Sequence, residues 1–141
     1  MITSATINDF SAIVSLYKQL WEQWDLFDEV KLKEMFENDL NTERKVYFIA
    51  KNDDVVMGVC SVRINQDWHY IKTATVDEII VNKDHRKKGI GRSLLEKACE
   101  YSKENKCYRI ELHSNIHRTD AHRFYEEFGF DKSSFYFKKK L

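Results

Sequence analysis

Ile79-Ile80-Val81-Asn82-Lys83-Asp84-His85-Arg86-Lys87-Lys88-Gly89-Ile90-Gly91-Arg92-Ser93-Leu94-Leu95 is the stretch of sequence that decides the fold. It begins as an apolar strand pattern, passes into a basic turn with two glycines, and continues with the apolar spacing of a helix. Glycines at 89 and 91 lack a Cβ where the backbone must approach a ligand, and the first N–H groups of a helix have no intrahelical partner. Together with the positive end of the helix dipole, this pattern predicts a cradle for a pyrophosphate.

The side chains of this turn add full positive charges around the predicted anion site. We expect the backbone N–H groups of residues 87–92 to contact the pyrophosphate. The predicted binding residues of the cradle are Arg86, Lys87, Lys88, Gly89, Ile90, Gly91, Arg92 and Ser93. The alternative is a helix cap on the surface followed by a solvated basic run.

Two motifs in the same order favour the first interpretation. Arg86-Lys87-Lys88-Gly89-Ile90-Gly91 resembles the acyl-CoA-binding signature Arg/Gln-x-x-Gly-x-Gly/Ala of the GNAT superfamily of N-acetyltransferases. The segment from Ala121 to Phe130 is similar to the Ala-x-x-x-Tyr-x-x-x-Gly-Phe element of the same family, and the helix start from Ala5 to Asp9 also matches. The resemblance implies an acetyl-CoA-dependent N-acetyltransferase, with acetyl-CoA as co-substrate.

The order of predicted elements agrees with this resemblance. A short strand at Ile2 precedes a helix that starts with the N-cap Thr6 and runs to about residue 23, and a second helix covers residues 29–40. Strands follow at 46–50, 55–64 and 73–81, then a helix from 89 to about 104 and a strand at 108–113. A last helix over 119–128 ends at Gly129, and Phe130 to Lys140 is predicted to form one or two final strands.

These elements define the expected fold class. It is α/β (α+β), the GNAT fold: a mixed central β-sheet flanked by helices in the order β-α-α-β-β-β-α-β-α-β. With 141 residues the chain is long enough for one compact core and too short for two ordinary ones, so we expect residues 1–141 to form one domain.

Acetyl transfer to an amine needs a deprotonated amine, a polarised thioester carbonyl and a proton for the leaving thiolate. Tyr125 resembles the general acid of the family, and a phenol can protonate a thiolate. Glu78 resembles the strand carboxylate that some members use as a base, directly or through water; a substrate clamp or a partner for a basic side chain is the alternative. Strand alternation predicts that Asp77 points to the opposite face. Backbone N–H groups around Ile80 and Val81 are expected to polarise the carbonyl.

One position departs from the family pattern. GNAT sequences commonly place asparagine three residues before the alanine of Ala-x-x-x-Tyr, whereas this chain has Arg118 there and Asn115 three residues earlier. Either Asn115 turns inward to the cofactor or Arg118 reaches the pantetheine or a phosphate. Both are therefore predicted cofactor contacts, as is Tyr125.

The charge distribution predicts where an acceptor would bind. Net charge is zero, but residues 1–82 carry 8 basic and 14 acidic side chains while residues 83–141 carry 15 and 9. Acidic side chains gather in residues 21–43, so we expect a cationic small-molecule amine, or a peptide amine, as acceptor. A solvated helical face is the alternative. The predicted substrate-binding residues are Trp24, Asp25, Phe27, Asp28, Glu29 and Glu78.

Other classes of protein fit less well. Zero net charge disfavours a nucleic-acid-binding domain built on the lysine and arginine runs, and a non-catalytic acyl-CoA-binding regulatory module is disfavoured by Tyr125. Apolar runs of membrane-spanning length and a secretory signal pattern are missing, which predicts a cytoplasmic protein without membrane contact. Cys60, Cys99 and Cys107 lack metal-ligand spacing, and the cluster of His113, His117 and His122 lacks further ligands nearby, so no metal is expected. The resemblance also allows a homodimer.

Overall fold

The structure is a computed structural model and describes residues 1–21 and 27–141. A five-stranded sheet forms its centre, with strand order β1-β2-β3-β4-β5. Neighbouring strands run antiparallel except for β4 and β5, which are parallel. The strands are β1 (Ile2–Ser4), β2 (Val46–Asn52), β3 (Val55–Gln66), β4 (Lys72–Val81) and β5 (Arg109–Leu112).

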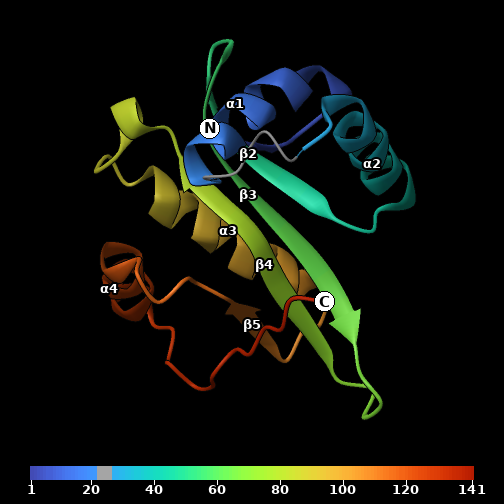
Figure 1. Cartoon of the computed structure of the whole chain (residues 1–141), viewed down its shortest axis with the longest axis vertical. Coiled ribbons are helices and arrows are strands. Elements are labelled where there is room, and N and C mark those ends of the chain that lie inside the picture. Colours follow the sequence, from blue (N-terminus) through green and yellow to red (C-terminus); the bar gives the residue numbers. More distant parts are fainter. Residues whose placement is uncertain (22–26) are drawn as a thin grey trace.

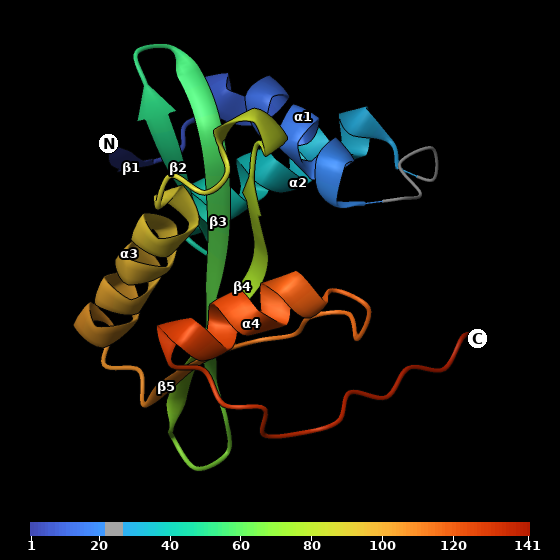
Figure 2. The same ribbon diagram turned by 90° about the vertical axis from the view of Figure 1, so that its left-hand side faces the viewer.

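Helices cover both faces of this sheet. α1 (Phe10–Leu20) and α2 (Glu29–Thr42) lie on one side, and α3 (Ile90–Glu104) lies on the other, as the two views in Figures 1 and 2 show. α4 (Thr119–Phe128) follows β5, and two short 3-10 turns, η1 (Ile7–Asp9) and η3 (Lys83–His85), precede α1 and α3. The predicted capping box at Thr6 is confirmed, because its N–H donates to Asp9 Oδ2 at 2.8 Å.

Two apolar clusters hold the layers together, one on each face of the sheet. The first joins Ile13, Leu16 and Tyr17 of α1 and Phe36 of α2 to the sheet. The second joins Leu94, Leu95 and Ala98 of α3 and Tyr125 of α4 to the opposite face. α3 is amphipathic because its apolar residues recur at three- and four-residue spacing, and burial of such a stripe contributes most of the stability of a helix in a protein.

β4 changes face in its middle. Before this point its even-numbered residues Ala74 and Val76 lie in the cluster under α3, but after it Ile80 lies in the cluster under α1. The cause is a β-bulge: Ser61 of β3 pairs with Glu78 and Val62 pairs with Val76, which leaves Asp77 as an extra residue. The prediction that Asp77 and Glu78 point to opposite faces is therefore wrong, since the bulge puts both on the α1 side.

The final strands predicted from Phe130 to Lys140 are also not formed. All of residues 130–141 are described, and they contain no helix or strand. The ring of Tyr136 contacts His113 just beyond β5, with 4.5 Å between ring centroids, while Phe135 and Phe137 project from the fold. Three consecutive aromatic residues give no alternation of apolar and polar side chains, and this removes the usual register signal of a strand that has one buried face.

Candidate active site

The predicted cradle lies at the start of α3. Gly89 has φ +78° and forms the N-cap, and Lys87 just before it has φ +59°. This left-handed backbone turns the chain sharply, and only glycine adopts it without strain. The first helical residues follow at once, so their N–H groups face outward without intrahelical partners. The sequence prediction of a glycine turn that opens a helix is confirmed at the level of the backbone.

A large groove runs from this cradle to α4. Its volume is about 720 Å³, and it lies between the end of β4, the start of α3 and the N-terminal half of α4. Of the predicted cofactor residues, those that line it are Ile80, Val81, Arg86, Lys87, Gly89, Ile90, Gly91, Arg92, Arg118 and Tyr125. Groove residues that the sequence did not single out for the cofactor are Ile79, His85, His117, Thr119, Asp120, Ala121 and Phe124.

Three predicted cofactor residues lie outside this lining: Lys88, Ser93 and Asn115. Asn115 instead organises the turn before α4. Its side-chain Oδ1 accepts from the His117 N–H at 3.2 Å, and its carbonyl oxygen lies 2.9 Å from His122 Nε2 and 3.0 Å from the Arg118 N–H. Of the two candidate cofactor contacts at this corner, Arg118 lines the groove and Asn115 does not.

One strand edge in the groove is open. β4 and β5 pair only from Thr73 and Arg109 to Val76 and Leu112, so residues 77–81 of β4 have no partner on the β5 side. The N–H of Asn82 donates to Met57 of β3 at 2.8 Å. Because successive N–H groups of a strand alternate in direction, the N–H of Ile80 also faces β3, whereas those of Ile79 and Val81 face the open edge. The Ile80 N–H was expected to contact the thioester carbonyl, but it faces β3. The Val81 N–H, expected to make the same contact, does face the open edge.

Gly91 allows the close packing of α3 against α4. A Cβ at this position would lie 3.3 Å from Phe124 Cζ and 3.6 Å from Val81 Cγ2. The two glycines of the motif thus have different physical roles. Gly89 supplies a backbone conformation, and Gly91 supplies space between a strand, a helix and an aromatic ring.

Tyr125 is buried at the inner end of the groove. Its ring packs between Phe124 and Phe130, with centroid distances of 5.5 Å and 6.0 Å. Gly129 has φ +114°, and its N–H donates to the Tyr125 carbonyl at 3.1 Å, which ends α4 and fixes the tyrosine in its last turn. Burial raises the pKa of the Tyr125 hydroxyl above its usual value, partly opposed by the nearby Arg118 guanidinium. The phenol is therefore protonated at neutral pH, as a proton donor must be.

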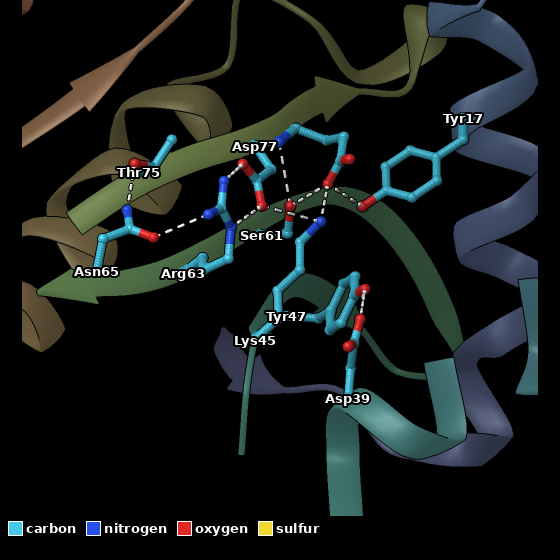
Figure 3. Close-up of polar contacts among 10 residues, drawn as sticks. Tyr17, Asp39, Lys45, Tyr47, Ser61, Arg63, Asn65, Thr75 and Asp77 are labelled. Carbon is cyan, nitrogen blue, oxygen red and sulfur yellow. Dashed lines mark hydrogen bonds and ion pairs between the residues drawn. The ribbon is translucent and has the colours of Figure 1, made fainter. Parts of the chain in front are cut away.

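Glu78 lies on the side of β4 that faces α1, because its carboxylate contacts Tyr17 of α1 and Lys45. Figure 3 shows polar side chains of this network, among them Tyr17, Lys45 and Ser61. Its Oε2 accepts from Lys45 Nζ at 2.7 Å, from the Ser61 hydroxyl and from the Tyr17 hydroxyl at 3.5 Å. The Ser61 hydroxyl oxygen in turn accepts from the Glu78 N–H at 3.1 Å. The carboxylate is thus oriented by Tyr17 of α1, by Lys45 directly before β2 and by Ser61 of β3.

Asp77 shares the same lysine. Lys45 Nζ lies 3.3 Å from Asp77 Oδ2, and Arg63 donates to both Asp77 oxygens at 2.9 Å and 3.1 Å. Burial alone would raise the pKa of Asp77, but the hydrogen bond from Arg63 and the charge of Lys45 lower it below its usual value. Two carboxylates and two cations therefore meet at the bulge.

A small cavity lies beside this cluster, between α1, α2 and the sheet. Its volume is about 40 Å³, and Lys45, Tyr47 and Glu78 form its polar part. The rest of its lining is mostly apolar: Phe10, Ile13, Val14, Tyr17, Trp21, Leu32, Met35 and Phe36. Tyr47 donates to the buried carboxylate of Asp39 at 2.7 Å.

The predicted acceptor residues have mixed outcomes. Trp24 and Asp25 lie outside the described residues. Phe27 stacks on Trp21 at 4.9 Å between centroids, and Trp21 lines the small cavity. Asp28 is the N-cap of α2, where its side chain accepts from the N–H groups of Val30 and Lys31, and Glu29 pairs with Lys18 at 3.2 Å. Asp28 and Glu29 therefore have local partners within the fold, and their contact with an acceptor stays a prediction.

Lys45, Ser61 and Tyr17 are the site residues that sequence reasoning missed. The position of Tyr17, at helical spacing among apolar residues, predicts only a core side chain. The register of β3 with β4 could not be read from the sequence, and that register places Ser61 opposite Glu78. A lysine directly before an apolar strand gives no local signal of this role.

In residues 1–21 and 27–141 no helix has both the length and the apolar character needed to cross a membrane. The same residues contain no group of three or more histidine, cysteine, aspartate or glutamate side chains placed to hold a metal ion. His113 contacts Tyr136, and His122 contacts the Asn115 carbonyl.

The comparisons with known proteins agree with this geometry. The aminoalkylphosphonate N-acetyltransferase of Salmonella typhimurium is 29% identical over 97% of this chain and 88% of its own length. The spermidine N(1)-acetyltransferase of Vibrio cholerae is 30% identical over 77% of this chain and 61% of its own length.

Solved structures share the fold. A protein from Bacillus halodurans described as a transcriptional regulator superposes with a TM-score of 0.89 at 24% identity, covering 100% of this chain and 99% of its own. The aminoglycoside N-acetyltransferase AAC(6')-Iy in complex with CoA superposes with a TM-score of 0.85 at 18% identity, covering 100% and 95%. The model of the acetyltransferase (GNAT) family matches residues 13–130, so the chain belongs to this family and is an acetyl-CoA-dependent N-acetyltransferase.

Proposed function

We propose that this enzyme transfers acetyl from acetyl-CoA directly to a small primary amine in a ternary complex. The observation that carries the proposal is the open edge of β4 at residues 77–81, with the large groove beside it and the Glu78 cluster facing α1. Two substrates that approach this edge from the two sides would meet there. The strand itself supplies fixed N–H donors at the meeting point.

The groove holds the acetyl-CoA in this proposal. The N–H groups of the first turn of α3 bind the diphosphate, and Arg86, Lys87 and Arg92 add positive charge around it. Arg86 is already oriented, because its Nε donates to the Val81 carbonyl at 3.1 Å. Arg118, at the start of α4, lies at the opposite wall of the groove and is available for a phosphate or the pantetheine.

Three groups of the chain perform the chemistry. Glu78 takes a proton from the acceptor ammonium, directly or through a water molecule, and leaves a nucleophilic amine. The outward N–H groups of Ile79 and Val81 stabilise the negative charge that develops on the thioester oxygen. As the new N–C bond forms and the C–S bond breaks, Tyr125 donates its proton to the leaving thiolate, and the second proton of the attacking nitrogen restores the phenol, directly or through a water molecule.

The thiols of the chain support direct transfer over an acetyl-cysteine intermediate. Cys60 is fully buried in the cluster under α3, and burial raises the pKa of its thiol far above the usual value. A thiol of this kind is a poor nucleophile, because the thiolate is the reactive form. Cys99 and Cys107 line neither the groove nor the small cavity.

The acceptor class rests on charge and on the relatives. α2 carries Glu34 and Glu37 on its exposed surface, and negative charge attracts an ammonium group before it binds. The named relatives act on two kinds of amine: the Salmonella enzyme on aminoalkylphosphonates, and the Vibrio enzyme on a polyamine. A small primary amine is common to both.

The test is a panel of primary amines scored for release of free CoA. We expect at least one small amine to be acetylated, with lines in double-reciprocal plots that intersect, as a ternary complex requires, and a large loss of turnover in Glu78→Gln. Parallel lines, which indicate a covalent intermediate, would contradict direct transfer. Tight acetyl-CoA binding without turnover on any amine or peptide would instead favour the non-catalytic acyl-CoA-binding module.

A further inference from the structure

Lys45 occupies the position that a substrate ammonium group would need. Its Nζ lies 2.7 Å from Glu78 and 3.3 Å from Asp77, and its side chain is only 12% exposed. The ammonium also lies 5.3 Å from the centroid of the Tyr47 ring. The proposed base is therefore already paired with an amine of the protein itself.

The charges at the bulge are balanced. Lys45 pairs with both carboxylates, Asp77 and Glu78, and Arg63 pairs with Asp77, so two positive and two negative charges are linked in one chain of ion pairs. Among the described residues, Asp39 is a further carboxylate nearby, and it accepts a hydrogen bond from the Tyr47 hydroxyl. A second ammonium brought into this cluster would find a cation already in place, and like charges at short range are costly in a partly buried site.

Space leads to the same conclusion. Within the described residues, the cavity beside Glu78 has a volume of about 40 Å³. A cavity of this size holds a few water molecules and excludes a polyamine, because each water needs at least roughly 10–15 Å³. Occupation of the Glu78 Oε2 position by an acceptor amine therefore requires the Lys45 ammonium to move.

We infer that Lys45 determines acceptor specificity by binding an anionic group of the acceptor. The preferred acceptor is then a small zwitterion, an amine with a carboxylate or phosphonate a few atoms away. Its anionic group draws the Lys45 ammonium away from Glu78 while Lys45 keeps its contact with Asp77. Glu78 then receives the acceptor ammonium in place of the lysine.

This inference rests on the proposed function, and it makes the acceptor and the base interdependent. An acceptor without an anionic group leaves Lys45 on Glu78 and has to compete with it. An acceptor with a second ammonium also repels Lys45. We therefore expect kcat/KM to be highest for a zwitterionic acceptor, lower for an amine whose other end is uncharged, and lowest for a diamine.

The first experiment uses the unmodified enzyme and three amines of matched length. These are β-alanine, n-propylamine and 1,3-diaminopropane, which differ in the group at the end of the chain, with 2-aminoethylphosphonate as a second anionic probe. We expect kcat/KM for the better of the two anionic amines to exceed that for 1,3-diaminopropane by about tenfold or more, the factor that one charge-assisted contact gives. Equal values, or a preference for the diamine, would overturn the inference.

The second experiment changes Lys45. Lys45→Met keeps the length of the side chain and removes its charge, and Lys45→Arg keeps the charge. We expect Lys45→Met to raise KM for the anionic amine by about tenfold or more, with a smaller effect on kcat, and to improve the diamine relative to it. Lys45→Arg should retain most of the preference for the anionic amine. An unchanged ratio of the two kcat/KM values in Lys45→Met would contradict the assignment.

Two controls separate this inference from the proposed function. Lys51→Met removes another ion-paired lysine of the same strand region, which contacts Asp9 at 3.3 Å and does not line the cavity, so the preference should not change. Acetyl-CoA affinity is measured by calorimetry in every variant. Turnover with the diamine but not with the anionic amines would leave the acetyltransferase reaction intact and refute only the role of Lys45.

Discussion

Removal of the Tyr125 hydroxyl tests the proposed acid most directly. In Tyr125→Phe the ring remains, and its packing against Phe124 and Phe130 at 5.5 Å and 6.0 Å should be retained. Because the ring keeps its packing, loss of the hydroxyl alone should cost no more than about 1.5 kcal/mol of folding free energy, the upper value for one ordinary hydrogen bond. The variant should therefore fold, and any large kinetic defect would belong to the missing proton.

The expected kinetic loss is much larger than the loss of stability. A positioned general acid contributes roughly 100-fold or more to the rate, and 100-fold corresponds to about 2.7 kcal/mol in the activation free energy. Because burial raises the pKa of Tyr125 above its usual value, the wild-type acid keeps its proton through pH 9. Turnover should accordingly show no alkaline decline caused by this residue between pH 7 and pH 9, a range about one unit or more below the ordinary tyrosine pKa of about 10.

The assay is steady-state release of free CoA at saturating acetyl-CoA, with acetyl-CoA affinity measured separately. Tyr101→Phe is the matched control, because Tyr101 is also partly buried, packs on Phe48 at 5.5 Å and does not line the groove. We expect Tyr101→Phe to retain turnover and Tyr125→Phe to lose it with little change in acetyl-CoA affinity. A decrease of less than about tenfold in Tyr125→Phe would show that water or another residue supplies the proton.

Three further predictions follow from the same structure. Gly91→Leu should abolish acetyl-CoA binding in calorimetry, because a Cβ there lies 3.3 Å from Phe124 and the rest of the side chain enters the groove; wild-type affinity in this variant would exclude the cradle. Gly89→Ala should instead lower the free energy of unfolding by about 1–2 kcal/mol, because residue 89 has φ +78°. Asp28→Ala should cost about 0.5–2 kcal/mol in chemical denaturation through loss of the α2 N-cap, and an acceptor KM that rises without any loss of stability would instead restore Asp28 as a substrate residue. Burial raises the pKa of Tyr17 and Tyr47 above the unfolded value of 10.0, so the unfolded chain releases these two protons at lower pH than the folded chain does. The free energy of unfolding should therefore fall as pH rises beyond 10.0, and a free energy of unfolding that is constant up to pH 11 would contradict this.

The sequence by itself determined the cradle and the two motifs. Their signals are local: a left-handed turn needs glycine at 89, a helix must leave its first N–H groups free, and Gly129 ends the helix that carries Tyr125. Each of these depends on residues within a few positions of one another. The order of helices and strands up to residue 128 was predictable for the same reason, since apolar periodicity is a local property.

Tertiary structure alone decided the surroundings of Glu78. The bulge at Asp77 arises from the pairing of β4 with β3, and it reverses the face of every residue after it, which simple alternation cannot reveal. The contact between Lys45 and Glu78 joins residues 33 positions apart, one directly before β2 and the other in β4. Likewise, Asp28 and Glu29 were predicted as substrate contacts from charge alone, but the fold gave them partners in α2 and α1. A charge pattern states which groups are present, whereas only the packed fold determines which of them are left for a substrate.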